Sequence, residues 1–432
     1  MQRPRHPTAD RPRSTVRTVA VGGLFVALVV GSTVPSALWP TYQDRLGFGV
    51  ETTTVLFACY VLALLPATLV AGPVADTAGA RPVVAISVVV AGVAILLLAA
   101  APSVGWLAVG RVLQGVAVGT AGAPLTAALL AVEAHGNRRQ ASLLATALLT
   151  AAAGGGAVLS GVVADRSSLV APYVVAGGLL VVAAAVALPL LPGRPPRRVP
   201  VRLWSRPALP SASGARRRFI VAAVGSLAVW AIGYAGLAVA PSFSVAVLHR
   251  HDPLVVGVPA GVLLLVSAAV QVLTARRDTA AVTRCGLVVL LPGLTGLAAV
   301  AVWPSLPLLL AALGLLGAGH GLVFMAALRE ATAVAAPGTD AATSSLFFAA
   351  TYLGGVLPVL GIGALSALVG LAAALQIFCA VAASAVVTLI VVARRPHSRG
   401  HRRDEQDRRG SKPLGPRLPV RSSVGPDARR WL

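Results

Sequence analysis

The sequence has few charged residues for its length. Charged residues make up 12% of 432 residues, about half of the roughly 25% that a soluble domain carries. Hydrophobic residues make up 56%, and the mean hydropathy is +0.83. The apolar residues form continuous runs of about 20 residues, the length that an α-helix needs to cross a bilayer. Short alternating segments, which a β-barrel would need, are lacking, so the sequence predicts an all-α polytopic membrane protein.

Lysine and cysteine are also scarce. Lys412 is the only lysine, and the three cysteines lie far apart, each inside an apolar run. Their spacing fits neither a metal site nor a disulfide framework. The sequence also lacks a phosphate-binding P-loop and a Ser/His/Asp constellation. These absences argue against ATP-driven transport within this chain, and we expect no enzyme activity, no cofactor and no metal site.

The net charge of +22 comes from arginines in the tails and in alternate loops. If the N-terminus is cytoplasmic, the arginine-rich segments all fall on the cytoplasmic side, as the positive-inside rule requires. The loops on the other side hold only Arg45, Arg166 and Arg250. The charge therefore marks topology, which argues against a nucleic-acid partner. We expect an even number of spans in the cell membrane, with both termini cytoplasmic.

Apolar runs and the breaks between them predict twelve spans in two halves. A basic tail (1–17) precedes the first half (18–191). A Pro/Arg-rich cytoplasmic linker (192–218) leads to the second half (219–393), and a basic, disordered tail (394–432) follows. The expected spans are 18–40, 52–72, 82–101, 105–131, 140–164, 169–191, 219–247, 254–275, 284–303, 306–329, 341–367 and 370–393.

The two halves resemble each other at an offset close to 200 residues. Pro35 in the first span corresponds to Pro241 in the seventh, and Asp76 corresponds to Asp278. Glycines in spans 4 and 10 follow the same offset: Gly115 with Gly317, and Gly119 with Gly321. Spans 5 and 11 are also rich in glycine, which lets helices pack closely: Gly154, Gly155, Gly156, Gly161, Gly354, Gly355 and Gly361. A duplicated half is a recurrent plan of secondary transporters.

The turn between spans 2 and 3 carries regularly spaced glycines and charges: Gly72, Asp76, Gly79 and Arg81. This pattern resembles the signature loop of the major facilitator superfamily, although Ala80 stands where the family usually has a second basic residue. The resemblance implies a conformational latch that closes the cytoplasmic side. It also implies that Glu133, at the inner end of span 4, pairs with Arg81. A surface pair between Glu133 and Arg138 is the alternative.

Arg111 and Gln114 in span 4 resemble a second element of this family, Arg-x-x-Gln-Gly. The resemblance implies that Arg111 faces a central cavity, where it moves protons or holds an anionic group. Snorkelling to the outer interface is the alternative. Span 5 is similar to the glycine-rich span of the family's exporters, but Ala157 replaces a proline and Ser160 replaces a glycine. The resemblance covers residues 18–393 and implies the major facilitator fold.

None of the fourteen acidic residues lies at the centre of a span, which makes a cationic substrate less favoured. His320 lies inside span 10 and titrates near neutral pH, so it is the first candidate proton carrier. A neutral histidine bonded to a helix carbonyl is the alternative. Glu51, at the mouth of span 2, is the second candidate. The side chains expected to line the substrate cavity are Trp39, Tyr60, Trp230, Tyr234, Gln271 and Tyr352.

The sequence thus predicts a secondary transporter that works by alternating access. We expect it to be a monomer that exports a small neutral or weakly acidic amphipathic compound in exchange for protons. Its partners would be the lipid bilayer, the substrate and protons. The departures in span 5 keep open an importer of a sugar or an amino acid. A membrane sensor or scaffold that docks through its basic tail is a further alternative.

Overall fold

The computed structural model describes residues 11–132, 138–191, 209–210, 212–249, 251–334 and 340–394. Within these residues, twelve helical segments are long and apolar enough to cross a membrane. The predicted all-α fold with twelve spans is therefore confirmed. Glu133, most of the predicted linker and nearly all of the predicted C-terminal tail lie outside the described residues.

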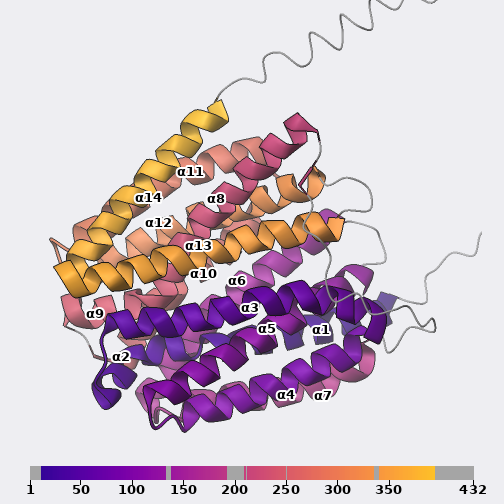
Figure 1. Cartoon of the computed structure of the whole chain (residues 1–432), viewed down its shortest axis with the longest axis horizontal. Coiled ribbons are helices and arrows are strands. Elements are labelled where there is room, and N and C mark those ends of the chain that lie inside the picture. Colours follow the sequence, from indigo (N-terminus) through magenta and orange to yellow (C-terminus); the bar gives the residue numbers. More distant parts are fainter. Residues whose placement is uncertain are drawn as a thin grey trace, which may run out of the picture. The chain divides into compact units, whose positions relative to one another are not determined.

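The first half runs from α1 to the short 3-10 helix η1 and is drawn in indigo to magenta in Figure 1. Its elements are α1 Arg11–Thr33, α2 Pro35–Leu46, α3 Val50–Ala78, α4 Ala80–Ala99, α5 Val104–Val132, α6 Arg138–Arg166, α7 Ala171–Ala187 and η1 Leu188–Leu190. The second half comprises α8 Ser213–Ala238, α9 Ala240–Leu248, α10 Pro253–Leu273, α11 Thr279–Val300, α12 Leu306–Ala333, α13 Asp340–Val369 and α14 Leu371–Arg394.

Two helices begin inside segments that were expected to be a tail or a linker. Helix α1 starts at Arg11, inside the segment expected to be a tail, and α8 starts at Ser213, inside the expected linker. Arginine favours a helix nearly as much as alanine does. A helix therefore continues past the last apolar residue, which a hydropathy boundary does not detect.

The first span of each half is broken before a proline. Helix α1 ends at Thr33 and α2 begins at Pro35; α8 ends at Ala238 and α9 begins at Ala240, with Pro241 in its first turn. Proline has no N–H group and its ring clashes with the carbonyl four residues earlier, so a helix bends or stops there. The matched breaks follow the offset predicted for the internal repeat.

Glycines bring two spans of each half into backbone contact. An added Cβ at any of four glycines would collide with a carbonyl oxygen of the neighbouring helix, so only glycine fits there. In the first half α5 contacts α3, and in the second half α12 contacts α10. The colliding pairs are Gly115 with Tyr60, Gly119 with Leu64, Gly317 with Leu263 and Gly321 with Ser267. Both members of each pair keep the offset close to 200 residues, so the repeat extends from sequence to packing.

The two halves meet along two helix pairs, since α6 packs on α10 and α3 packs on α13. We call the end of the bundle that carries the α2–α3 connection the predicted outer end. There, Gln43 Nε2 of α2 donates a hydrogen bond to Ser242 Oγ of α9 at 3.0 Å. An added Cβ at Gly161 of α6 would lie 2.6 Å from the carbonyl oxygen of Pro253 at the start of α10. The predicted outer ends of the halves are therefore in contact.

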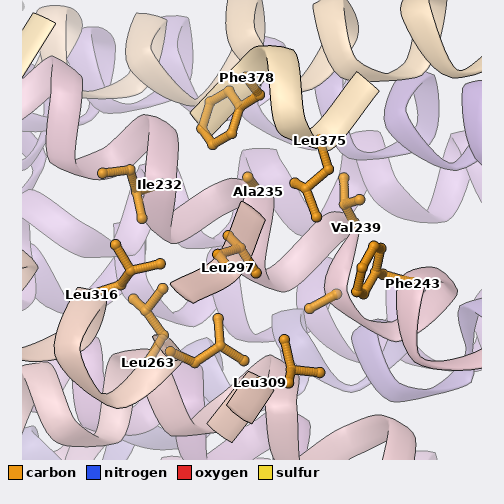
Figure 2. A pocket seen from close by; sticks show the side chains of 13 residues that line it. Ile232, Ala235, Val239, Phe243, Leu263, Leu297, Leu309, Leu316, Leu375 and Phe378 are labelled. Atoms are coloured by element: carbon orange, nitrogen blue, oxygen red, sulfur yellow. The ribbon is translucent and has the colours of Figure 1, made fainter. Parts of the chain in front are cut away.

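The second half encloses a small apolar cavity of about 20 Å³. Figure 2 shows the side chains around it, among them Phe243 of α9, Leu297 of α11 and Phe378 of α14. All thirteen lining residues are apolar. A cavity of this size has room for one water molecule, but a buried water needs two to four polar partners. This space is therefore a packing defect rather than a recognition site.

Candidate functional site

Arg111 of α5 lies in the interior, against the broken end of α1. Its Nη1 donates to the carbonyl oxygen of Ser32 at 2.9 Å and to Gln114 Oε1 at 2.6 Å, and Gln114 Nε2 donates to the carbonyl oxygen of Gly31 at 2.9 Å. The Gly31 carbonyl has no helical donor because the residue four positions later is Pro35, which lacks an N–H. The proline break therefore supplies an acceptor that fixes Gln114 beside Arg111.

Aromatic rings surround the Arg111 guanidinium. Its central carbon lies 4.3 Å from the ring centroid of Tyr60, 5.5 Å from that of Phe57 and 5.9 Å from that of Trp39. These distances allow cation–π attraction, which strengthens when water is excluded. Arg111 is 2% exposed, so its side chain does not snorkel to the outer interface. The expectation that it faces a central cavity, where it moves protons or holds an anionic group, stays a prediction.

No carboxylate neutralises Arg111 within the part of the chain that the structure describes. The acids whose exposure the structure describes are exposed or half-buried and lie near the ends of helices or in connections: Asp44, Glu51, Asp165, Asp252, Asp278 and Glu330. The ion pair that the structure shows joins Arg218 and Glu330, with 2.7 Å between nitrogen and oxygen. Arg111 Nε is buried without a hydrogen-bond partner. A buried cation without a counter-charge is costly, so this site favours an anion.

A second polar cluster surrounds His320 of α12. His320 is completely buried, and its Nδ1 lies 2.9 Å from Ser267 Oγ of α10. Gln271 Nε2 of α10 donates to Ser267 Oγ and to Thr150 Oγ1 of α6, each at 3.2 Å. His320 thus bonds a side chain rather than a helix carbonyl. Because Thr150 belongs to the first half and the other three residues to the second, this cluster crosses the interface between the halves.

A row of aromatic rings connects the two polar clusters. Phe57 of α3 lies 5.2 Å from Tyr234 of α8 between ring centroids, Tyr234 lies 4.9 Å from Trp230, and Trp230 lies 5.1 Å from His320. The Phe57–Tyr234 contact joins the first half to the second. The row therefore runs from the Arg111 guanidinium to the His320 imidazole. Five of the six predicted cavity residues, all but Tyr352, belong to this row or to its two polar ends.

Several buried polar atoms around this row have no hydrogen-bond partner. They are Trp39 Nε1, Arg111 Nε, Trp230 Nε1, Gln271 Oε1 and His320 Nε2. Each such atom loses its bonds to water without replacement, at a cost of about 1–3 kcal/mol. Groups kept in this state are available to a ligand. Both donors and an acceptor are present, so the row offers polar recognition at its ends and apolar contact between them.

Two predicted site residues do not belong to this row. Glu51 is exposed in the first turn of α3 at the predicted outer end. It stays in contact with water, because the helix begins at the surface rather than inside the bundle. Tyr352 of α13 is half-buried and stacks on Phe348, with 6.2 Å between ring centroids. It also interacts electrostatically with Tyr60 and Tyr234, so it borders the row. Of the candidate proton carriers, His320 is therefore the one that the fold buries.

The predicted latch loop is shorter than expected. Helix α3 continues to Ala78, so Gly72 and Asp76 belong to the helix and the turn is reduced to Gly79. Gly79 has a φ of +90° and accommodates the sharp change of direction into α4; an L side chain would be strained there. Arg81 is exposed at the start of α4. The expected pair with Glu133 lies outside the described residues and stays a prediction.

The glycine-rich stretches contact neighbouring helices at most of the predicted positions. A Cβ added to Gly154 would lie 2.6 Å from the carbonyl oxygen of Gly261. A Cβ added to Gly156 would lie 2.8 Å from the carbonyl oxygen of Val30. In the second half, Gly354 lies against Leu227 of α8, and Gly355 lies against the ring of Tyr234. Gly155 and Gly361 were expected to belong to the same contacts. This expectation is wrong, because an added Cβ at either position meets nothing within 4 Å.

Sequence reasoning missed Phe57, Thr150 and Ser267. Phe57 precedes Tyr60 by three positions and Ser267 precedes Gln271 by four, so each shares a helix face with a residue that was selected. That spacing is the signal that identifies them. Thr150 offers no such signal. Its role depends on a contact with Gln271, which is 121 residues away in the sequence.

The fold and the site together define a class of protein. Two repeats of six spans enclose a centre of polar and aromatic residues, and this is the plan of a secondary transporter. The family model described as Major Facilitator Superfamily matches residues 19–356. The chain therefore belongs to the major facilitator superfamily.

Solved structures agree with this assignment at the level of the fold. A bacterial homologue of the human lysosomal transporter Spinster, in an inward-facing and occupied conformation, has a TM-score of 0.65 and 16% identity. The comparison covers 88% of this chain and 95% of that chain. The human organic anion transporter MFSD10 (TETRAN) has a TM-score of 0.63 and 16% identity, covering 88% of this chain and all of that one. Among curated protein sequences, none matches this chain.

Proposed function

We propose that the protein exports a small, weakly acidic amphipathic compound across the cell membrane in exchange for protons. The observation that carries the proposal is Arg111, a buried cation that has no carboxylate partner among the described residues. A bound carboxylate or sulfonate would supply the missing charge, and a guanidinium binds such groups through a planar fork. The acidic group of the substrate therefore binds at Arg111.

The aromatic row accounts for the apolar part of the substrate. Phe57, Tyr234 and Trp230 offer ring surface between Arg111 and His320. Ring pairs in such contacts add about 0.5–1.5 kcal/mol beyond the burial of area. Of the proteins similar in fold, MFSD10 is named an organic anion transporter. The likeness concerns the fold alone, so the substrate class depends on Arg111 and the row.

His320 is the proton carrier in this proposal, because it is a buried histidine and histidine is the side chain whose unperturbed form changes charge between pH 5 and 8. The termini lie in the cytoplasm, on the arginine-rich side of the membrane. The segment from Gly72 to Arg81 acts as the latch of the cytoplasmic side, with Asp76 as its charged member. Rocking of the two halves about α3, α6, α10 and α13 exposes the site to each side in turn.

Inside-out membrane vesicles test this function. The vesicle interior is made acidic, and a pH-sensitive dye reports protons that leave while single compounds are added outside. We expect aromatic carboxylic acids to cause proton efflux, because their carboxylate binds Arg111 and their ring binds the aromatic row. Matched aromatic amines should cause none, because the buried cation repels them.

The chain offers a matched pair of variants for this assay. Arg111→Gln should abolish the dye response, whereas Arg166→Gln, a change at an exposed arginine at the end of α6, should preserve it. A response to amines, or an unchanged response in Arg111→Gln, would contradict the anion assignment. Uptake of sugars or amino acids without proton counterflow would favour the importer.

A further inference from the structure

We propose that Thr150, Gln271, Ser267 and His320 form a hydrogen-bond relay that transmits the protonation of His320 to the contact between the two halves. The inference rests on the proposed proton exchange and adds the route by which a proton changes the conformation. Gln271 is the positioning residue of the relay, because its amide bonds one side chain from each half.

The present bonds define one polarity. Gln271 Nε2 donates both to Ser267 Oγ and to Thr150 Oγ1, while Gln271 Oε1 has no partner. Ser267 Oγ thus accepts a hydrogen bond from Gln271, and its own proton is free to point at His320 Nδ1, 2.9 Å away. We assign Nδ1 as the acceptor in this contact, which makes the imidazole neutral with its proton on Nε2.

Protonation of His320 makes this polarity impossible. A protonated Nδ1 is a donor, and both ring nitrogens of an imidazolium donate. Ser267 Oγ then accepts from Nδ1, and its hydroxyl proton must find a different acceptor. The unpartnered Oε1 of Gln271 belongs to the adjacent side chain. Rotation of the Gln271 amide by half a turn brings Oε1 to the position that Nε2 now holds.

The reversed relay weakens the interface. In the present state the Thr150 hydroxyl donates to the carbonyl oxygen of Thr146 at 3.0 Å. Thr150 can therefore accept a hydrogen bond from Gln271 without losing its own bond to Thr146. After the rotation Gln271 Oε1 meets Thr150 Oγ1, and the contact survives only if Thr150 turns its proton away from Thr146. The Gln271 amino group meanwhile loses both acceptors. The hydrogen bond that joins α6 to α10 is thereby lost, and buried polar groups are left unpaired, which costs free energy.

The groups around His320 leave no competing charge within the described residues. Helix α8 presents Trp230 and Gly233, α10 presents Ser267 and Leu264, and α12 itself presents Phe324. Tyr234 of α8 is the nearest titratable group along the ring row and lies beyond Trp230. On the other packed helices the titratable groups lie elsewhere: Arg284 and Cys285 of α11 are exposed, and Tyr352 of α13 stacks on Phe348.

The position of the relay gives the direction of the effect. Gln271 lies in the last turn of α10, toward the predicted inner end, whereas the Gln43–Ser242 bond joins the halves at the predicted outer end. Protonation therefore loosens the inner part of the α6–α10 contact and leaves the outer link in place. A carrier that has taken a proton from outside then opens inward, the order that an exporter exchanging substrate for protons requires.

Distance measurements between spin labels test the relay without any substrate. The labels are placed at Val19 of α1 and Leu273 of α10, which are 69% and 80% exposed near the predicted inner ends of the two halves. The native cysteines Cys59, Cys285 and Cys379 are replaced by alanine. Acidification of the purified full-length protein in lipid nanodiscs, from about pH 8 to about pH 5, covers the range in which histidine changes charge. We expect the distance distribution to shift to longer values.

Four variants locate the origin of the shift. His320→Gln should abolish it because the titrating group is gone. Thr150→Val and Ser267→Ala should also abolish it, although His320 remains, because each interrupts the relay. Thr351→Val should preserve it, since Thr351 is a buried threonine whose hydroxyl bonds Ser226 within the second half. Size-exclusion profiles show which variants fold. If Thr150→Val does not fold, Ser267→Ala alone tests the interruption of the relay.

Each outcome decides the inference. A shift that persists in Ser267→Ala and Thr150→Val but is lost in His320→Gln would overturn the relay and leave His320 as a proton site that acts by another route. A distance between the two labels that does not change with pH in the otherwise wild-type protein would also overturn the relay, even if the dye assay shows proton exchange. A relay-dependent shift combined with silence in the dye assay would support the relay and contradict the proposed export.

Discussion

At the scale of single residues, Arg111 shows how a proline creates a site. Pro35 leaves the Gly31 carbonyl without a donor, Gln114 occupies that carbonyl, and Arg111 is held between Gln114 and Ser32. None of these contacts neutralises the guanidinium. In the proposed function, the residue is fixed in place for an anion that none of the side chains described by the structure supplies. Burial of this charge lowers the stability of the ligand-free protein, and binding of an anion would remove this cost.

The substitution Arg111→Met tests this trade-off. Replacing buried charges by apolar groups of similar volume is often neutral or stabilises a protein by about 1–4 kcal/mol. We expect the ligand-free variant to melt at a higher temperature than the wild type while binding of aromatic carboxylates is lost. Loss of a buried charged partner costs about 2–5 kcal/mol in binding. Thermal melting in detergent and ligand-induced shifts of the melting temperature measure both effects.

The control for this substitution is Arg166→Met. Arg166 is exposed at the end of α6, so its replacement should change neither stability nor binding. A lower melting temperature for Arg111→Met would mean that the bonds of Arg111 to Ser32 and Gln114 stabilise the fold more than its burial costs.

At the scale of helices, the repeated glycine contacts make α3 with α5, and α10 with α12, into tightly joined pairs. Gly115 and Gly119 in one half, and Gly317 and Gly321 in the other, bring backbones together where a side chain would collide with a carbonyl oxygen. Helices α3 and α10 also meet the opposite half, through α13 and α6 respectively. We therefore expect each pair to move as one body in the proposed rocking of the halves.

The substitution Gly317→Val tests the contact of α12 with α10. An added Cβ would collide with the Leu263 carbonyl oxygen, and overpacking of this kind costs about 1–3 kcal/mol. We expect a lower melting temperature and a smaller yield of monodisperse protein. Gly314→Val on the same helix is the control, because an added Cβ there meets nothing within 4 Å. Equal melting temperatures for the two variants would contradict the close approach of the helices.

The limits of prediction from sequence follow from the same contacts. All twelve spans were predictable because each is a continuous apolar run. The common offset between glycines of the two halves predicted the repeat. Arg111, Gln114 and His320 were recognisable as ionisable or polar groups at membrane depth. Phe57 and Ser267 were not, because a phenylalanine or a serine in a membrane helix has no distinguishing chemistry. The bond from Thr150 to Gln271 depends on how two halves dock, which no local pattern encodes.

At the scale of the whole molecule, the absence of a carboxylate beside Arg111 among the described residues has an electrical consequence for the proposed exchange. With a monovalent anion bound, the proposed site is neutral; after release and proton uptake, Arg111 and His320 would together carry two positive charges. The proposed exchange of one such anion for one proton therefore moves two charges inward in every cycle. Each charge gains about 2.3 kcal/mol per 100 mV, so about 100 mV, negative inside, contributes about 4.6 kcal/mol. That energy supports a concentration ratio of about two-thousandfold.

Export is thus expected to respond to voltage even without a pH difference. In proteoliposomes with equal pH on both sides, a potassium diffusion potential set with valinomycin should by itself drive accumulation of an aromatic carboxylate. Reversing the potential should reverse the movement. If the membrane potential does not affect the exchange, a negative charge must compensate Arg111 during the cycle. A voltage-driven carrier of this kind keeps working in a neutral medium, where the proton gradient alone contributes little.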